Sequence, residues 1–413
     1  MKKRNFMLSL LICSSVVISN SFPAFAYSTF NDHVFTGGVS NLTYSTEDDS
    51  VNSYIESTMK SAANSWNNTN CGVSLTETAK HGSANIIFYY DEDLTNAADD
   101  NAGVIAFTKF YLTNSKWVGG DSDNHSGPTS NWSKSHIIIN PSVYNTLSTS
   151  VKTASLAHEL GHAFGLAHSN DRTVLMYPSS ARTVYTPQID DTNGIIHLYG
   201  SRLTSSKSTN LSTPSTLNIT DTTTSSAVTA DETDFSYVAT LEDCLKNYSD
   251  VNELTNDSNT IIQGEIQDKI SSYDKSGIFT DVKIKVTNNL AGTLKAGDVI
   301  SVRLRGGTIA GEDAKGFRMQ IMKADGITSD NVSSDKITEV IDGSDNFNKG
   351  DSSLFFLNCV NNKYYVTGSH QGKFKLTNDS VQLHDKLKSK YGDLKKEDFI
   401  KDIKNAVLNK KEK

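Results

Sequence analysis

Three histidines and a glutamate in the stretch HELGHAFGLAH, residues 158–168, restrict how this part of the chain can fold. His158 and His162 are four residues apart, so on a helix both imidazoles leave the same face, one turn apart. Gly165 can adopt the positive φ of a sharp turn, which would bring His168 back toward the other two. The spacing therefore predicts a helix followed by a tight turn.

These residue types suit one particular chemistry. Three neutral imidazoles can bind zinc at about 2.0–2.1 Å and leave one tetrahedral position open, as in catalytic sites. Glu159 lies about 100° around the helix from His158, close enough to reach a water at that position. We therefore predict one catalytic Zn²⁺ bound by His158, His162 and His168. We also predict peptide-bond hydrolysis with Glu159 as the general base.

Residues 1–26 are typical of a secretory signal peptide. The basic start Met-Lys-Lys-Arg precedes an apolar run, and the small-residue site Ala24-Phe25-Ala26 follows it. The run is shorter than the roughly 20 residues that span a bilayer, and no later stretch is long and apolar enough. We expect a secreted, extracellular protein with no membrane span. The Asn/Lys/Ser-rich, cysteine-poor composition favours a Gram-positive bacterial origin.

The charge of the chain argues against nucleic acid as a partner. The formal net charge is −8, and the signal peptide alone contributes +3, so the mature chain carries about −11. No basic patch precedes the C-terminal tail. The remaining cysteines, Cys71, Cys244 and Cys359, are too few for a disulfide framework, although the last two could pair.

A run rich in Ser and Thr divides the chain. Residues 201–233 contain too few apolar side chains to build a core, so we expect a linker there. It separates a first domain, 27–200, from a second, 234–413. In the first domain, apolar spacing and turn residues predict an α+β fold. We expect helices at 51–66, about 150–163 and 190–200, and strands at 84–90, 103–112 and 135–140.

The second domain is expected to be β-rich. Five segments between residues 259 and 368 alternate apolar and polar side chains, a pattern that suggests a small barrel of the OB kind. A helix at about 395–408 carries Phe399, Ile403 and Val407 on one stripe. Two roles stay open for this domain: a tethered module that binds a surface or matrix ligand, and a passive solubility domain.

HELGHAFGLAH resembles the HExxHxxGxxH signature of the metzincin zinc endopeptidases, and Ser169 follows it as in the matrixin branch. The stretch VLMYP supplies the methionine of a Met-turn, and DDTNGIIHLYG resembles the closing helix of matrixin catalytic domains. The resemblance covers about residues 28–200. It implies a zincin fold, a mixed twisted sheet with long helices.

The resemblance also implies a role for particular residues. Met176 would form a hydrophobic floor under the imidazoles, and an upper-rim strand would pair with an extended substrate. Two residues would begin the outer wall of the pocket for the side chain after the scissile bond, and a small residue on the zinc helix would line it. The rim residues are Val104, Ile105, Ala106 and Phe107, the wall residues Tyr177 and Pro178, and the lining residue Ala154.

Other features depart from the animal matrixins. No cysteine-bearing pro-segment lies between Ala26 and the domain, so we expect no cysteine switch. Phe107 stands where a structural zinc site would fall, and His125 and His136 are expected to be surface or strand histidines. The acidic run 91–101 offers oxygen ligands suited to Ca²⁺, and a solvated loop is the equal alternative.

We therefore predict a secreted, zinc-dependent, matrixin-like endopeptidase that acts on extracellular proteins or peptides. Two alternatives stay open. One is a secreted binding or adhesion protein with a catalytically silent zincin scaffold, against which the intact Glu159 argues. The other is a zinc amidase acting on cell-wall peptides, which would use the same metal chemistry.

Overall fold

A computed structural model describes residues 27–411, apart from 80, 91–102, 113–117, 119–126, 208–236, 275–276, 325–331, 342–346, 361–362, 384 and 393–394. The predicted signal peptide, the acidic run 91–101, His125 and most of the Ser/Thr-rich run lie outside these residues. Within the described part, no helix is long and apolar enough to cross a bilayer.

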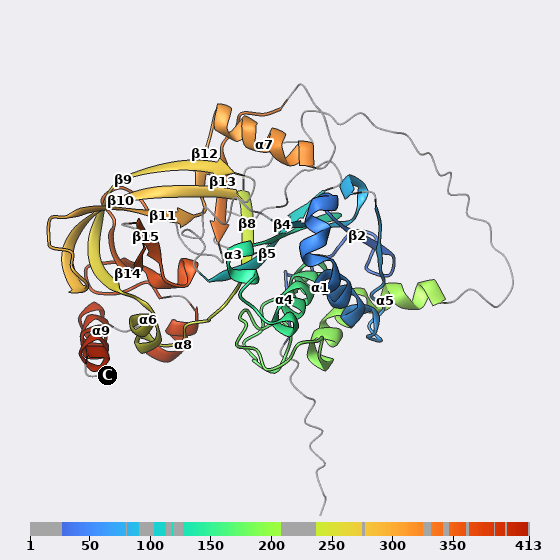
Figure 1. Ribbon diagram of the computed structural model, residues 1–413, viewed down its shortest axis with the longest axis horizontal. Helices are drawn as coiled ribbons and strands as arrows, with labels where there is room; N and C mark the ends of the chain where they lie inside the picture. Colours follow the sequence, from blue (N-terminus) through green and yellow to red (C-terminus); the bar gives the residue numbers. More distant parts are fainter. Residues whose placement is uncertain are drawn as a thin grey trace, which may run out of the picture.

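The first half is α+β, as predicted: a mixed sheet carries two long helices (Figure 1). Its strands are β2 (Leu42–Thr46), β3 (Leu75–Glu77), β4 (Ile86–Tyr90), β5 (Val104–Tyr111) and β6 (Lys134–Ile139). Its helices are α1 (Asp49–Asn67), α3 (Pro141–Tyr144), α4 (Thr149–Ala163) and α5 (Ile189–Lys207), and short strands β1 (Ser28–Thr29) and β7 (Leu166–Ala167) pair with each other.

Local sequence explains why the long helices form where they do. Asp48 caps α1 by accepting from the backbone N–H of Val51, and Ser148 caps α4 in the same way. The apolar stripe of α1 is buried against α4, and the indole of Trp66 donates to the Ala157 carbonyl over 2.8 Å. This pairing fixes the helix that carries the predicted zinc ligands.

Helix α5 runs to Lys207, past the end expected at Gly200. A glycine inside a helix costs only about 1 kcal/mol relative to alanine, so Gly200 weakens the helix without ending it. The first residues of the predicted linker are therefore helical. The domain boundary near residue 200 itself stays a prediction.

The second half is β-rich and contains a closed five-stranded barrel, in agreement with the OB-like pattern. The barrel order is β9 (Thr260–Asp274), β10 (Gly277–Ala291), β11 (Val299–Arg305), β15 (Lys363–Val366), β14 (Ser352–Val360) and back to β9. Strand β16 (Lys373–Leu376) adds to β14, and α6 (Val251–Asp257), α8 (Asp385–Tyr391) and α9 (Lys396–Lys411) lie together at one end (Figure 1). The predicted stripe on α9, Phe399, Ile403 and Val407, is buried.

One sheet joins the two halves, which the expectation of a loosely tethered module did not foresee. Its eight strands run in the order β12-β13-β8-β5-β6-β4-β2-β3. The added strands are β8 (Tyr237–Cys244), β12 (Gly307–Ile309) and β13 (Ile337–Ile341), and helix α7 (Glu312–Ala324) lies between the last two in sequence. Figure 1 shows β8 beside β5 at the junction between the barrel and the first half.

A buried ionic cluster ties the junction together. The carboxylate of Glu339 on β13 lies 3.5 Å from the Lys109 ammonium on β5 and 3.6 Å from the Arg305 guanidinium, and it accepts from the Ile278 N–H. The Arg305 guanidinium also lies 3.9 Å from the centre of the Phe107 ring. Burial lowers the pKa of Lys109 to about 8, although Glu339 opposes this shift.

Candidate metal centre and cleft

The structure brings the three predicted zinc ligands together. One ring nitrogen from each of His158, His162 and His168 lies within 4.8 Å of the other two. The first two leave one face of α4, and their ring centres are 4.6 Å apart. Among the described residues, this is the group of His, Cys, Asp and Glu side chains placed to bind a metal ion.

The surroundings of the histidines fit a metal site. The Nδ1 atoms of His158 and His162 lie 2.8 Å and 2.7 Å from the carbonyls of Leu175 and Leu166, which directs both Nε2 atoms to the common centre. Both Nε2 atoms are buried and have no hydrogen-bond partner among the residues that the structure describes. Burial lowers the pKa of His162 to about 4 and that of His158 well below its ordinary value, so both rings are neutral at pH 7. Neutral, unbonded nitrogens are what zinc requires.

The turn that delivers His168 depends on Gly165, as the spacing predicted. Gly165 has φ of 109°, and its N–H donates to the His162 carbonyl over 2.8 Å. A side chain there would also lie 2.8 Å from Leu198 on α5. Glycine is therefore required both for the left-handed backbone and for the close approach of α5.

Met176 packs against the helix that carries the predicted zinc ligands, and its role as a floor under the imidazoles stays a prediction. It is buried and packs against Gly161, where an added Cβ would lie 3.1 Å from the methionine methyl and nearer still to its sulfur. The carboxylate of Asp191 on α5 holds this turn by accepting from the N–H groups of Leu175 and Met176 at 2.9 Å and 3.1 Å. Sequence reasoning placed Asp191 only at the start of a helix.

Glu159 is fully buried, and its carboxylate accepts a 2.7 Å hydrogen bond from the hydroxyl of Thr108 on β5. The same hydroxyl lies 3.1 Å from the Glu159 carbonyl. Thr108 therefore fixes the orientation of the predicted base. Sequence reasoning ended the rim at Phe107 and missed this residue, which is 51 positions away in sequence.

The predicted rim residues lie on β5, and all four are fully buried. One edge of β5 pairs with β6, and the other edge pairs with β8. The edge expected to pair with substrate is thus bonded to another segment of the same chain.

Arg182 links the predicted wall residue Tyr177 to α4. The Tyr177 carbonyl accepts from the Arg182 Nε over 3.3 Å, and the Arg182 guanidinium reaches the Ser155 hydroxyl at 3.5 Å. Ala154 is buried in the hydrophobic core, and its neighbour Ser155 contacts Arg182. Sequence reasoning named neither Arg182 nor Ser155.

His136 is a buried strand histidine, with its ring centre 4.3 Å from that of Tyr111, as expected. Cys71, Cys244 and Cys359 are free thiols, so the open pairing of the last two does not form.

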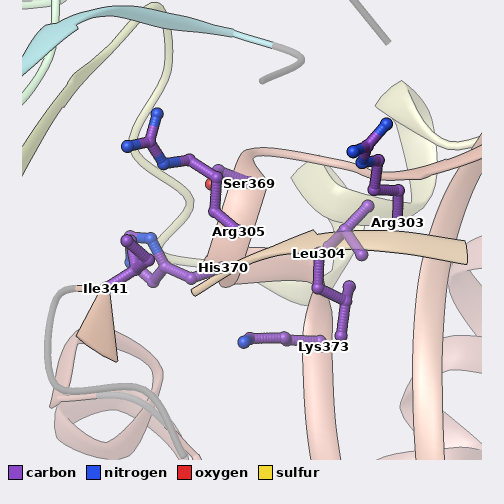
Figure 2. Close-up of a pocket in the computed structure, with 8 residues that line it drawn as sticks. Arg303, Leu304, Arg305, Ile341, Ser369, His370 and Lys373 are labelled. Atoms are coloured by element: carbon purple, nitrogen blue, oxygen red, sulfur yellow. The ribbon is translucent and has the colours of Figure 1, made fainter. Parts of the chain in front are cut away.

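A pocket lies in the barrel, and the charged groups that line it do not converge on one point. Residues Arg303, Arg305, His370 and Lys373 help to line it. Figure 2 shows the two guanidinium groups well apart near the top of the view and the Lys373 ammonium apart from both near the bottom. Arg305 is already paired with Glu339. The pocket therefore offers no convergent set of donors for an anion.

Comparisons with known proteins agree with this geometry. Residues 36–200 match the matrixin family of peptidases. Matrix metalloproteinase-18 of Xenopus laevis is 34% identical over 134 residues, which are 32% of this chain and 25% of that protein. Matrix metalloproteinase-27 of Homo sapiens is 51% identical over 47 residues, which are 11% of this chain and 9% of that protein. Matrix metalloproteinase-9 of Canis lupus familiaris is 53% identical over 47 residues, which are 11% of this chain and 7% of that protein.

The chain spans about a quarter or less of the length of these relatives. The match covers the zinc-ligand helix, the Met-turn and the closing helix α5 as far as Gly200. Residues 36–200 are therefore a matrixin-like metzincin domain.

Proposed function

We propose that this chain is a secreted, zinc-dependent endopeptidase that hydrolyses peptide bonds of extracellular proteins. The observation that carries the proposal is the cluster of His158, His162 and His168 around one centre, with the buried Glu159 beside it. The matrixin match supports the same chemistry. The signal-peptide pattern of residues 1–26 supports secretion.

The histidines, Glu159 and Thr108 would each have a different role in hydrolysis. A zinc ion bound by the three imidazoles would polarise the substrate carbonyl and lower the pKa of water at the open position. Glu159 would take the proton of the attacking water and deliver it to the leaving amine. Thr108 holds the Glu159 carboxylate in one orientation, so little reorganisation is needed when the proton moves.

Two other functions use the same scaffold. A silent scaffold that only binds would not need a base, yet Glu159 is present, buried and oriented by Thr108. An amidase for cell-wall peptides would use the same centre. The Met-turn and the β5 edge, which here pairs with an extended segment of the same chain, favour the endopeptidase.

The test uses residues 27–413 and an Asp243→Ala chain, because β8 lies on the rim of the cleft. Each is incubated with a diverse peptide pool or with cell-wall peptides, with and without a zinc chelator, and new termini are read by mass spectrometry. We expect chelator-sensitive cleavage inside the linear peptides by the Asp243→Ala chain. Cleavage of cell-wall peptides alone would favour the amidase, and no cleavage by the zinc-loaded Asp243→Ala chain would favour the binding scaffold.

A further inference from the structure

Strand β8 lies where an extended peptide would add to the edge of β5. Its residues 241–244 pair antiparallel with residues 104–108, the segment predicted to pair with substrate. Pairing of main chains along a strand edge is a common way to hold an extended peptide. A segment of the chain itself therefore occupies the cleft rim.

The other side of β8 is held by the loop after the Met-turn. Cys244 forms a parallel bridge with Ser179, and the Ser180 N–H donates to the Cys244 carbonyl over 3.0 Å. The N–H of Leu245 donates to the Gly103 carbonyl over 2.6 Å, and its carbonyl accepts from the Ser180 hydroxyl over 2.7 Å. This stretch is bonded on both sides, as a peptide between two cleft walls would be.

The side chain of Asp243 enters the wall beside the zinc-ligand helix. It is fully buried, and its carboxylate accepts a 2.5 Å hydrogen bond from the Arg182 guanidinium. The same guanidinium reaches the hydroxyl of Ser155, which lies on α4 three residues before His158. The Asp243–Arg182 pair therefore lies about one helical turn from the first zinc ligand.

We propose that β8 is bound as an internal substrate mimic, and that Arg182 with Ser155 forms a pocket selecting Asp or Glu directly after the scissile bond. The inference rests on the proposed endopeptidase function and names its substrate class. In this register the Glu242–Asp243 peptide bond takes the place of the scissile bond. The intact chain is latent until β8 leaves the cleft.

The chemistry of the pocket explains the choice of side chain. Arg182 is 4% exposed, so without a carboxylate its guanidinium would be a buried charge with no counter-charge. A substrate carboxylate would restore the pair that Asp243 makes with the Arg182 Nη2 donor. A lysine side chain would meet a like charge, and a leucine would leave the guanidinium unpaired.

The test uses full-length chains that differ at Asp243 and Arg182. Asp243→Ala weakens the hold on β8, and Asp268→Ala on β9 is the exposed control. Arg182→Leu is made together with Asp243→Ala, so that neither charge is left buried alone. Substrates are peptides based on VATLEDCLKN, residues 238–247, with Asp, Asn, Leu or Lys at the position of Asp243. Amide hydrogen exchange of residues 241–245 reports whether β8 stays docked.

We expect Asp243→Ala to hydrolyse the Asp peptide at least about tenfold faster than the Lys and Leu peptides. Arg182→Leu/Asp243→Ala should lose this preference. Exchange at residues 241–245 should rise in Asp243→Ala and stay unchanged in Asp268→Ala. Cleavage with no acidic preference, an unchanged preference without Arg182, or unchanged exchange in Asp243→Ala overturns the inference. No cleavage of any peptide by zinc-loaded variants instead overturns the proposed function on which it rests.

Discussion

The buried Lys109 makes the stability of the junction depend on pH in a direction that can be calculated. Its pKa is about 8 in the folded protein, against 10.5 for an ordinary lysine. The unfolded chain therefore binds more protons between these values, so this group makes the folded state more stable as pH rises. A pKa shift of this size lowers the free energy of unfolding by about 3 kcal/mol when Lys109 is fully protonated. Between about pH 7.5 and pH 9, the free energy of unfolding regains about 1 kcal/mol of this loss.

Lys109→Met should remove this rise in stability with pH, because methionine fills the space of the buried aliphatic chain and does not titrate. The measurement is the free energy of unfolding in urea at the two pH values, for wild type, Lys109→Met and the exposed control Lys285→Met on β10. We expect wild type and the control to gain about 1 kcal/mol more than Lys109→Met between the two pH values. An equal change in the free energy of unfolding in all three proteins would refute the argument that burial lowers the pKa of Lys109.

Three further changes test the metal centre. Gly161→Ala should lower stability by about 1–3 kcal/mol, because its Cβ would crowd Met176, and thermal unfolding should show partial recovery when Met176→Ala is added. Asp191→Ala should weaken zinc binding about 10–100-fold in a chelator competition, since the loop that orients His158 loses its acceptor; unchanged affinity would contradict this role. Made in the Asp243→Ala chain, Thr108→Val should lower kcat about tenfold with zinc content unchanged, and Thr108→Ser should retain it; equal losses in both would show that the hydroxyl does not matter.

The metal ligands could be predicted from sequence because their geometry is local. His158 and His162 share one helix face, and Gly165 allows the turn that brings in His168, so eleven residues of chain fix the cluster. The helices α1 and α4 were also predictable, since capping residues and apolar spacing act within each segment. The barrel followed from strand alternation, although its closure through β14 and β15 did not.

What the sequence could not indicate is contact between distant segments. The Arg182–Asp243 pair joins residues 61 positions apart, and the Ser/Thr-rich run between them carries no signal of the pairing. Alternating apolar and polar residues can at most indicate that Tyr237–Cys244 is a strand. They do not indicate that it pairs with β5. Thr108 is an ordinary strand residue until the fold places it against Glu159. Each of these contacts is decided by tertiary packing and by which strand edge is left open.

The most direct test of the central claim compares peptide hydrolysis by Asp243→Ala with that by Asp243→Ala/Glu159→Gln, each shown by metal analysis to hold one zinc per chain. Glutamine keeps the size and the hydrogen bond to Thr108 but cannot accept the proton of the attacking water. The account predicts that kcat falls by about 10²–10⁴-fold while zinc content stays the same. Retention of full activity by the zinc-loaded Glu159→Gln protein would contradict it.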